Sequence, residues 1–493
     1  MLWSKESLKA LVSEKLQDYL FVVASNREPY IHNYFANEIK CVVPASGLTM
    51  ALDPVLRTCG GVWVAHGGGE ADRKVVDEKN RILVPPENPK YTLRRLWLNK
   101  AEETGYYYGF SNETLWPLCH IVYVKPKFDE ADWLHYKAVN EKFAKTILDE
   151  VGDKKAFVFI QDYHLTLVPK LLREINPEIK TALFWHIPWP NPEAFRICPW
   201  KDEILRGMLG ADLLGFHIPY HVDNFLNTVD QTLEVRVDKV SSTIISSGRE
   251  TLVKPFQISV DYEKMSSDAN LPELQSEIER LKKEYGLENR LIGVGSDRLD
   301  YTKGIPERFN AIDKFFEKYP EFIGKFTFIQ AGVLSRIHIQ RYKDLNDEIN
   351  AQVERINWKY CNDSCNGNWS PIILVRRQFS QKELVAIYVM ADICIVSSLH
   401  DGMNLVAKEY IATADPKKGM LILSRFTGAA RELTDALLVN PYAPDAFADS
   451  IKTGLEMPQD EKEKRMLKMK SIVSENNIYR WAGKIIQSLL RLA

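Results

Sequence analysis

The stretch "ADICIVSSLHDGMNLVAKEY", residues 391–410, joins a short apolar run to a helical pattern through a turn that contains Asp401 and Gly402. A short run of this kind, rich in Ile and Val, is typical of a strand buried on both faces of a parallel sheet. The residues from 404 onward have helical spacing, and glycine permits a sharp turn between the two segments. A strand, a turn and a helix in this order predict one βαβ repeat of an α/β fold.

Similar apolar runs alternate with helical patterns along the chain, beginning near residues 20, 156, 181, 212, 290, 326, 372, 420 and 436. About ten such strands are too many for one doubly wound sheet with ordinary connections. A break is expected at residues 253–265, where a Pro-containing connector precedes a charged helix. We therefore predict an α/β protein with two Rossmann-like domains, mainly parallel sheets and an interdomain cleft. The domains are residues 1–258 and 259–476, with a C-terminal helix at about 477–493 docked back on the first.

The composition is that of a soluble globular protein. Its 493 residues carry a net charge of −2, which gives no overall field for binding nucleic acid or an anionic membrane. No apolar run approaches the ~18 residues that span a bilayer, and the N-terminal residues read as an amphipathic helix rather than a secretion signal. Seven scattered cysteines do not indicate a disulfide framework, and Cys361 and Cys365 have no second ligand pair beside them. We predict a cytoplasmic protein with no nucleic-acid or membrane partner and no metal site.

Polar residues after the strands are the candidates for a site, because ligands of such sheets bind beyond the carboxyl ends of the strands. In "SDRLDYTKG", residues 296–304, Arg298 and Lys303 follow a strand and precede Gly304. Two cations beside backbone donors suit a diphosphate, which arginine can grip with two hydrogen bonds. The alternative is a solvated pair neutralised by Asp297 and Asp300.

The turn at 401–409 is a second candidate. The start of its helix leaves backbone N–H groups unpaired near residues 403–406, where anions or sugar oxygens bind. Asp401 can accept hydrogen bonds from hydroxyls, and Glu409 can accept from both hydroxyls of a ribose. The alternative is simple capping, with Asn404 as the cap and Glu409 facing solvent.

The first half of the chain has its own strand-end residues. Asp162 and His164 follow one predicted strand and His186 follows the next, before a rigid "IPWPNP" segment that would fix the imidazole. Arg27 ends the first predicted strand, where an anionic group could sit. The aromatic stretch at 105–116, with Tyr107 and Trp116, either faces a ligand or packs in the core.

Several motifs, taken in order, closely resemble the trehalose-6-phosphate synthase family. They are "SNREP" (25–29), "YYYGFSNETLWP" (106–117), "QDYH" (161–164), "HIPWPNPEAF" (186–195), "DRLDYTKGIPERF" (297–309), "DGMNLVAKEY" (401–410) and "TGAARELTDALLVNPY" (427–442). The resemblance extends from about residue 20 to the C-terminus. It implies a retaining GT-B glucosyltransferase that moves glucose from a nucleotide-glucose, by default UDP-glucose, to glucose 6-phosphate and so makes trehalose 6-phosphate.

The resemblance also implies roles for individual residues. It makes Arg298, Lys303, Asp401 and His186 the catalytic residues. The donor would be bound by Gly47, His186, Arg298, Lys303, Asp401, Met403, Asn404, Leu405, Val406 and Glu409. The acceptor would be bound by Arg27, Tyr107, Trp116, Asp162 and Arg336. Transfer would occur on the face that the diphosphate leaves, without a covalent nucleophile, a metal or a cofactor, since the nucleotide-sugar is itself a substrate.

The chain departs from the family pattern at three places, and the first two bear on the acceptor and leave alternatives open. Ser46-Gly47 stands where a glycine pair is usual, His66 where a tryptophan is usual, and His400 where an arginine is usual. A glucosylglycerol-phosphate synthase or a related synthase of phosphorylated glucosides is one alternative. A non-catalytic sugar-phosphate sensor is another, although such a protein should have lost donor-site charges that are present here. A homo-oligomer remains open.

Overall fold

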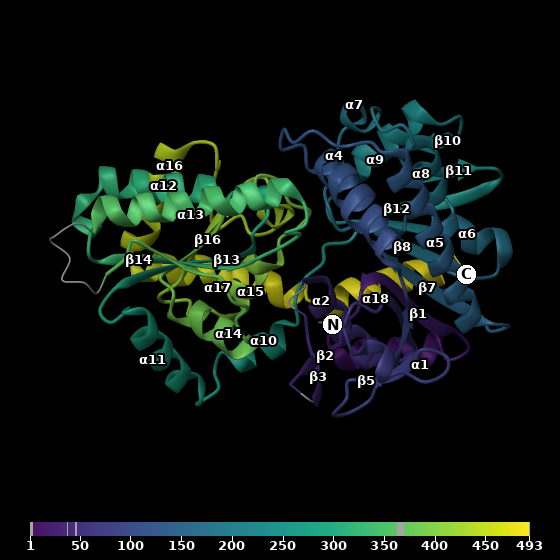
Figure 1. Ribbon diagram of the computed structural model, residues 1–493, viewed down its shortest axis with the longest axis horizontal. Helices are drawn as coiled ribbons and strands as arrows, with labels where there is room; N and C mark the ends of the chain where they lie inside the picture. Colours follow the sequence, from purple (N-terminus) through teal and green to yellow (C-terminus); the bar gives the residue numbers. More distant parts are fainter. Residues whose placement is uncertain (1–2, 37, 45–46, 362–368, 493) are drawn as a thin grey trace. The chain divides into compact units, whose positions relative to one another are not determined.

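The computed structural model describes residues 3–36, 38–44, 47–361 and 369–492, so Ser46 and Cys365 lie outside the described residues. The chain divides into two compact units (Figure 1). Unit 1 comprises Met1–Ile258 and Ile478–Ala493, and unit 2 comprises Ser259–Asn477.

Unit 1 is built on a ten-stranded sheet with the order β10-β11-β12-β9-β8-β7-β1-β4-β6-β5. Its parallel strands are β1 (Leu20–Arg27), β4 (Val62–His66), β6 (Tyr91–Leu96), β7 (Ala156–Gln161), β8 (Lys180–Phe184), β9 (Leu213–Phe216) and β12 (Arg249–Pro255). Antiparallel strands extend both edges: β5 (Arg81–Val84), β10 (Arg236–Asp238) and β11 (Thr243–Ser246). From β1 the chain builds outward to β4 on one side and later to β7 on the other. The strand order therefore reverses between β1 and β7, the topological switch point of unit 1.

Helices pack on this sheet, and a separate hairpin joins β2 (Ile31–Phe35) to β3 (Glu38–Val42). The longer helices are α1 (Lys5–Lys15), α2 (Gly47–Cys59), α5 (Glu130–Val151), α6 (Val168–Ile175), α8 (Lys201–Met208), α9 (Pro219–Thr232) and α18 (Ile478–Leu490). The short ones are η1 (Asp72–Lys74), α3 (Lys100–Glu102), α4 (Trp116–His120), η3 (Tyr163–Leu165) and α7 (Pro192–Phe195). The segment η2 (Glu103–Leu115) is a π-helix, a rare conformation that is frequent at functional sites.

The last helix, α18, returns to unit 1 and packs beside α1, α2, β8 and β9 (Figure 1). Its apolar stripe is buried, and the Trp481 ring lies 5.5 Å from the ring of Phe159 and 5.1 Å from that of Phe184. Lys180 Nζ donates to the carbonyl of Leu492 at 3.1 Å. The C-terminal helix is therefore part of the unit 1 core.

We predict that Trp481→Ala lowers the free energy of unfolding by about 3–5 kcal/mol, because a large buried ring is lost and a cavity remains. Urea unfolding followed by circular dichroism measures this change. The control is Lys484→Ala on the exposed face of the same helix, where a change within about 0.5 kcal/mol is expected. Equal effects of the two substitutions would contradict a packing role for α18.

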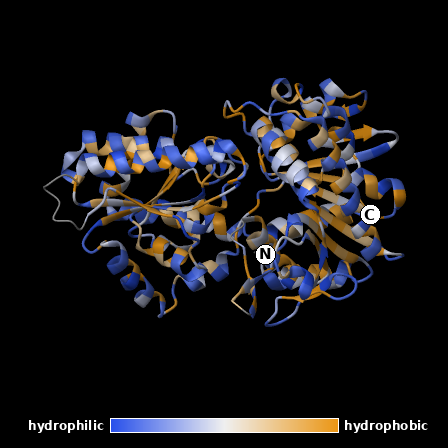
Figure 2. Ribbon diagram, in the orientation of Figure 1, coloured by the Kyte–Doolittle hydropathy of each residue, from blue (hydrophilic) through white to orange (hydrophobic). Residues whose placement is uncertain are grey.

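Unit 2 is a six-stranded parallel sheet with the order β15-β14-β13-β16-β17-β18. The strands are β13 (Leu291–Arg298), β14 (Phe326–Val333), β15 (Ile372–Val375), β16 (Ile393–Val396), β17 (Met420–Ser424) and β18 (Leu437–Val439). In chain order this is the 3-2-1-4-5-6 arrangement of a Rossmann fold, and its switch point lies between β13 and β16. In Figure 2 these strands are coloured mostly as hydrophobic, as expected for a sheet covered on both faces.

Two helical layers cover the unit 2 sheet (Figure 1). One layer contains α12 (Ile305–Lys318), α13 (Gln340–Tyr360) and α16 (Pro444–Glu456). The other contains α10 (Tyr262–Asp268), α11 (Leu274–Tyr285), α14 (Gln381–Met390), α15 (Leu405–Thr413) and α17 (Gln459–Glu475). Short 3-10 turns complete the unit: η4 (Tyr301–Lys303), η5 (Pro320–Phe322) and η6 (Gly428–Arg431).

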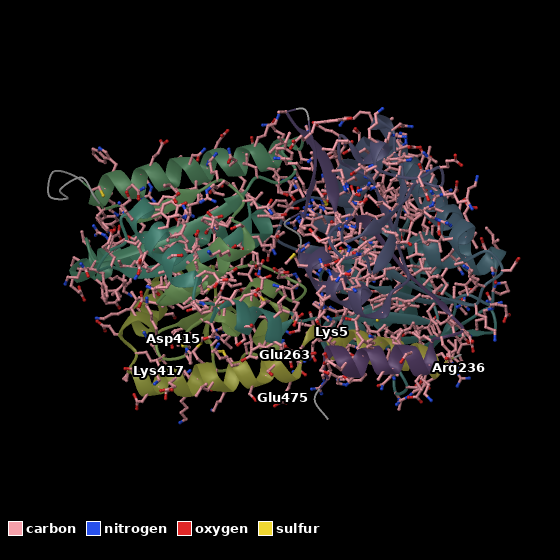
Figure 3. All side chains as sticks on the ribbon, turned by 90° about the horizontal axis from the view of Figure 1, so that it is seen from below. Lys5, Arg236, Glu263, Asp415, Lys417 and Glu475 are labelled. Carbon is pink, nitrogen blue, oxygen red and sulfur yellow. The ribbon has the colours of Figure 1, made fainter. Side chains whose placement is uncertain are left out.

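Charged side chains are exposed on both units. Six of them are labelled in Figure 3, and all six are exposed: Lys5, Arg236, Glu263, Asp415, Lys417 and Glu475. Across the described residues, no helix has both the length and the apolar character needed to cross a membrane.

Every apolar run that the sequence predicts as a strand is a strand in the structure, and the predicted N-terminal helix is α1. The prediction was incomplete in unit 1, where β2 to β6 and β10 to β12 were not expected. The break expected at 253–265 contains the boundary between the units, which falls between Ile258 and Ser259. Only residues 253–255 differ from the expectation, because they are the end of β12 rather than connector.

Candidate active site at the two switch points

The loop after β13 places its cations at the switch point of unit 2. Arg298 is the last residue of β13, and Asp300 caps the short turn η4, in which Lys303 is the final residue. Gly304 follows with a φ of +61°, and a Cβ at this position would lie 2.3 Å from the carbonyl oxygen of Ser397. Only glycine allows the loop to pass this close to the end of β16.

Lys303 and Asp401 meet across this switch point. Lys303 Nζ lies 2.5 Å from Asp401 Oδ2, and both side chains are 14% exposed. Asp401 Oδ2 also accepts from Ser398 Oγ at 3.1 Å and from Asn404 Nδ2 at 3.2 Å. The lysine is therefore held toward the start of α15.

Lys303 is not the solvated partner of Asp297 or Asp300 that the alternative expected, because its side chain is mostly buried and its ion pair is with Asp401. Asp297 pairs with Arg308, and Asp300 pairs with Arg336. The sequence could not show this, because Asp401 is almost a hundred residues away from Lys303 along the chain.

The start of α15 is compatible with both interpretations of residues 403–406, namely helix capping by Asn404 and ligand binding by backbone N–H groups. Asn404 has a φ of +79° and caps the helix, with its side-chain oxygen accepting from the N–H of Ala407 at 3.1 Å. The capping prediction is thus confirmed for Asn404. Met403 and Asn404 are buried, whereas Leu405 and Val406 are half-buried. A helix start still presents N–H groups that the helix itself does not use.

Glu409 does not face solvent as the capping alternative expected. It is half-buried, and Tyr388 Oη donates to its Oε2 at 3.3 Å. Burial raises the pKa of Glu409 to about 7, against the opposing effect of the Tyr388 hydrogen bond. The carboxyl group therefore titrates near neutral pH.

Arg336 belongs to unit 2 and is buried, with a φ of +50°. Its Nη1 donates to Asp300 Oδ2 at 3.1 Å and to Tyr342 Oη at 2.6 Å. Burial alone would raise the pKa of Asp300, but the charges of Arg336, Arg298 and Lys303 bring it below its usual value. Three predicted ligand-binding cations thus gather around one buried carboxylate.

The predicted residues of unit 1 gather in the same way at its own switch point. Arg27 ends β1, and Asp162 follows β7, the neighbouring strand. Asp162 has a φ of +74°; its N–H donates to the carbonyl of Phe184 at 2.7 Å, and its Oδ1 accepts from the N–H of His186 at 3.0 Å. These bonds tie the carboxyl ends of β7 and β8 together.

His186 is neutral at physiological pH, because burial and the nearby His217 and His164 hold its pKa well below the usual value. Its Nε2 lies 2.9 Å from Gln161 Oε1, while the Gln161 amide donates to the carbonyl of Phe159 at 3.3 Å. The glutamine oxygen is thus the acceptor, and His186 carries its proton on Nε2. Its Nδ1 is then a hydrogen-bond acceptor.

Tyr107, on the π-helix η2, contacts Arg27. Arg27 Nη2 donates to Tyr107 Oη at 3.0 Å, and the Tyr107 ring stacks on His164 with an interplanar angle of 14°. Trp116 is buried against His120 and Tyr163, as the packing alternative expected. Gly47 is the first residue of α2 and is exposed.

Three residues that support these groups were not predicted from the sequence: Ser398 beside Asp401, Tyr388 beside Glu409, and Arg308 beside Asp297. Arg308 could have been noticed in the sequence, because it lies in the "GIPERF" segment directly after Lys303. The spacing of that segment is, however, typical of an ordinary amphipathic helix, in which an arginine is expected to face solvent. Among the described residues, no group of His, Cys, Asp or Glu side chains is placed to hold a metal ion.

Comparison with known proteins identifies the family. The profile of glycosyltransferase family 20 matches residues 20–491. The UDP-forming α,α-trehalose-phosphate synthase of Pichia angusta is 36% identical over 87% of this chain and 89% of its own length. The trehalose-6-phosphate synthase of Mycolicibacterium gilvum is 35% identical over 95% of this chain and 93% of its own length.

Solved structures agree with the family match. An E. coli structure bound with UDP-2-fluoro glucose has a TM-score of 0.84 at 32% identity and covers 96% of this chain and 99% of its own. A Burkholderia xenovorans α,α-trehalose-phosphate synthase in complex with glucose-6-phosphate has a TM-score of 0.85 at 29% identity and covers 95% of this chain and 99% of its own. The two Rossmann-like units are those of the GT-B fold that the sequence motifs predict. The chain belongs to glycosyltransferase family 20.

Proposed function

We propose that this protein is a UDP-forming α,α-trehalose-phosphate synthase, which transfers glucose from UDP-glucose to glucose 6-phosphate. The observation that carries the proposal is the gathering of Arg298, Lys303 and Asp401 at the switch point of a Rossmann sheet, where nucleotides bind in this fold. Identity to UDP-forming synthases over nearly the whole chain supports it.

We assign donor binding to residues of unit 2, together with Gly47 and His186 of unit 1. Arg298 and Lys303 would neutralise the diphosphate, and Asp401 would accept hydrogen bonds from the glucose hydroxyls. The N–H groups of residues 403–406 would donate to a phosphate or sugar oxygen. Glu409 would accept from the ribose hydroxyls. With two cations on the leaving diphosphate, the proposal needs no metal ion.

The acceptor is assigned to Arg27, Tyr107, Trp116, Asp162 and Arg336, among which the two arginines suit a phosphate. Tyr107 already orients Arg27 by a hydrogen bond. Arg336 is held by Asp300 and Tyr342. An acceptor phosphate oxygen that binds Arg336 must therefore lie at the edge of the buried pair of Arg336 and Asp300.

The reaction is proposed to proceed with retention and without a covalent intermediate. The acceptor hydroxyl approaches on the face that the diphosphate leaves, and a leaving phosphate oxygen takes its proton. His186 is neutral, so it serves as a hydrogen-bond partner of the donor rather than as an acid. The rate then depends on positioning and on stabilising the charge of the leaving group.

A donor and acceptor panel tests the proposal. Purified protein is incubated with UDP-, ADP- or GDP-glucose and with glucose 6-phosphate or glycerol 3-phosphate, and the product is identified by mass spectrometry and NMR. We expect trehalose 6-phosphate from UDP-glucose and glucose 6-phosphate. Product formation only with glycerol 3-phosphate would instead favour the glucosylglycerol-phosphate alternative. That alternative is tested because His66 stands where the family usually has a tryptophan near the acceptor. Binding of both substrates without transfer would favour the sensor alternative.

The pKa of Glu409 predicts pH-dependent donor binding. The carboxyl must be ionised to accept from two hydroxyls, and its pKa in the free protein is about 7. UDP-glucose affinity should therefore rise about tenfold between about pH 6 and about pH 8, and the release of about one proton on binding near pH 6 should fall toward zero near pH 8. Calorimetry in two buffers of different ionisation enthalpy measures both quantities. Glu409→Gln should bind more weakly and without this pH dependence; an unchanged pH profile in that variant would contradict the ribose role.

A further inference from the structure

Arg308 is fully buried at the switch point of unit 2, where it links three strands of the sheet. It lies in the first turn of α12, and none of its side chain is exposed. Its Nε donates to Ser397 Oγ at 2.9 Å, its Nη1 to Gln330 Oε1 at 2.5 Å and its Nη2 to Asp297 Oδ2 at 2.8 Å. The partners belong to β13, to β14 and to the residue that follows β16.

Two of these partners lead directly to the cations of the donor site. Asp297 is the residue before Arg298 in β13. Ser397 Oγ lies 3.0 Å from the carbonyl oxygen of Lys303 and 2.8 Å from that of Gly304, and donates to them. The Arg308 guanidinium group therefore has two links to the cations. It binds Asp297, the neighbour of Arg298, and it reaches the Lys303 backbone through the Ser397 hydroxyl.

The strand is shaped around this guanidinium group. A Cβ at Gly295 would lie 2.2 Å from Arg308 Nη1, so the glycine in β13 leaves the space that the arginine occupies. Burial raises the pKa of Asp297, and the positive charge of Arg308 opposes that rise. A buried ion pair often gives no more stability than apolar residues of the same volume, but its directed bonds define a geometry.

We propose that Arg308 is a positioning residue for glucosyl transfer: through Asp297 and Ser397 it fixes the spacing of Arg298 and Lys303, and hence their fit to the donor diphosphate. The inference rests on the proposed function of that site. Arg308 itself does not reach the substrate, because its side chain has no exposed surface. Its effect on the rate must pass through the two cations.

A double-mutant cycle with Ser397 and Lys303 tests whether Arg308 acts on the rate through the Ser397 hydroxyl and Lys303. Ser397→Ala removes the hydroxyl between Arg308 and the Lys303 backbone while keeping the ion pair that Arg308→Ala would break. We expect Ser397→Ala to lower kcat about 10- to 100-fold, with the KM for glucose 6-phosphate unchanged, because a displaced cation fits the leaving diphosphate poorly. In a Lys303→Ala background, the same change should lower kcat by less than about twofold, since the group it positions is gone.

Thr327→Val is the matched control. Thr327 is a buried residue at the opposite end of the same sheet, and its hydroxyl donates to the carbonyl of Ser370 at 3.1 Å. It should lose a comparable amount of thermal stability and keep its kcat. An unchanged kcat in Ser397→Ala, or the same fold-loss in both backgrounds, would overturn the positioning role. A wild-type kcat in Lys303→Ala would overturn the proposed function as well, so the two failures are distinguishable.

Discussion

Replacement of Arg298 by alanine should lower kcat by about 10²–10³-fold, the usual cost of removing one well-placed charge donor from a transition state that develops negative charge. Its effect on stability should be small, because Arg298 is a partly exposed residue at the end of β13. Steady-state kinetics with UDP-glucose and glucose 6-phosphate, together with a thermal unfolding curve, separate the two effects.

Arg280→Ala is the control for this substitution, since Arg280 is an exposed arginine on α11 in the same unit. Its kcat should remain at the wild-type value. If Arg298→Ala retained wild-type turnover, or lost turnover only in proportion to lost folded protein, the diphosphate role of Arg298 would be refuted.

Asp401→Ala should separate binding of the sugar from binding of the nucleotide. If Asp401 accepts hydrogen bonds from the glucose hydroxyls, its loss should weaken UDP-glucose binding by about 10- to 100-fold, the value of a hydrogen bond to a charged group. UDP carries no glucose, and Lys303 would no longer be paired with the Asp401 carboxylate. UDP itself should therefore bind as tightly as to the wild type, or more tightly.

Calorimetric titration of both ligands into wild type and Asp401→Ala measures this difference. Asp415→Ala, which removes an exposed carboxylate beyond the end of α15, is the control and should bind both ligands normally. Equal weakening of UDP and UDP-glucose by Asp401→Ala would show that Asp401 acts on the nucleotide or on folding rather than on the sugar.

The sequence predicted the parts of the fold that depend on continuous apolar runs. All six strands of unit 2 were predicted, because strands such as β16 are buried on both faces and leave an unbroken Val and Ile signal. Most of the missed strands lack that signal. Strand β4 is the exception, because its apolar residues 62–65 are all buried and were overlooked. Strands β3 and β10 are short and partly exposed, and the β2–β3 hairpin pairs only with itself. Their positions depend on partners that local patterns do not specify.

The candidate site was predictable where residue type and strand end coincide, as for Arg298, Lys303 and Asp401. Its internal pairing was not predictable, because the partners are far apart along the chain. Nothing local indicates that Asp300 holds Arg336 or that Tyr388 contacts Glu409. Such contacts arise only when the sheet brings its strand ends together.

A crystal structure of the full chain with UDP bound would show whether the switch point of unit 2 holds the donor diphosphate. We predict diphosphate oxygens within about 2.7–3.2 Å of the Arg298 guanidinium and the Lys303 ammonium, with Glu409 on the ribose. A nucleotide bound elsewhere, or bound with both cations turned away from its phosphates, would show that Arg298 and Lys303 do not hold the diphosphate.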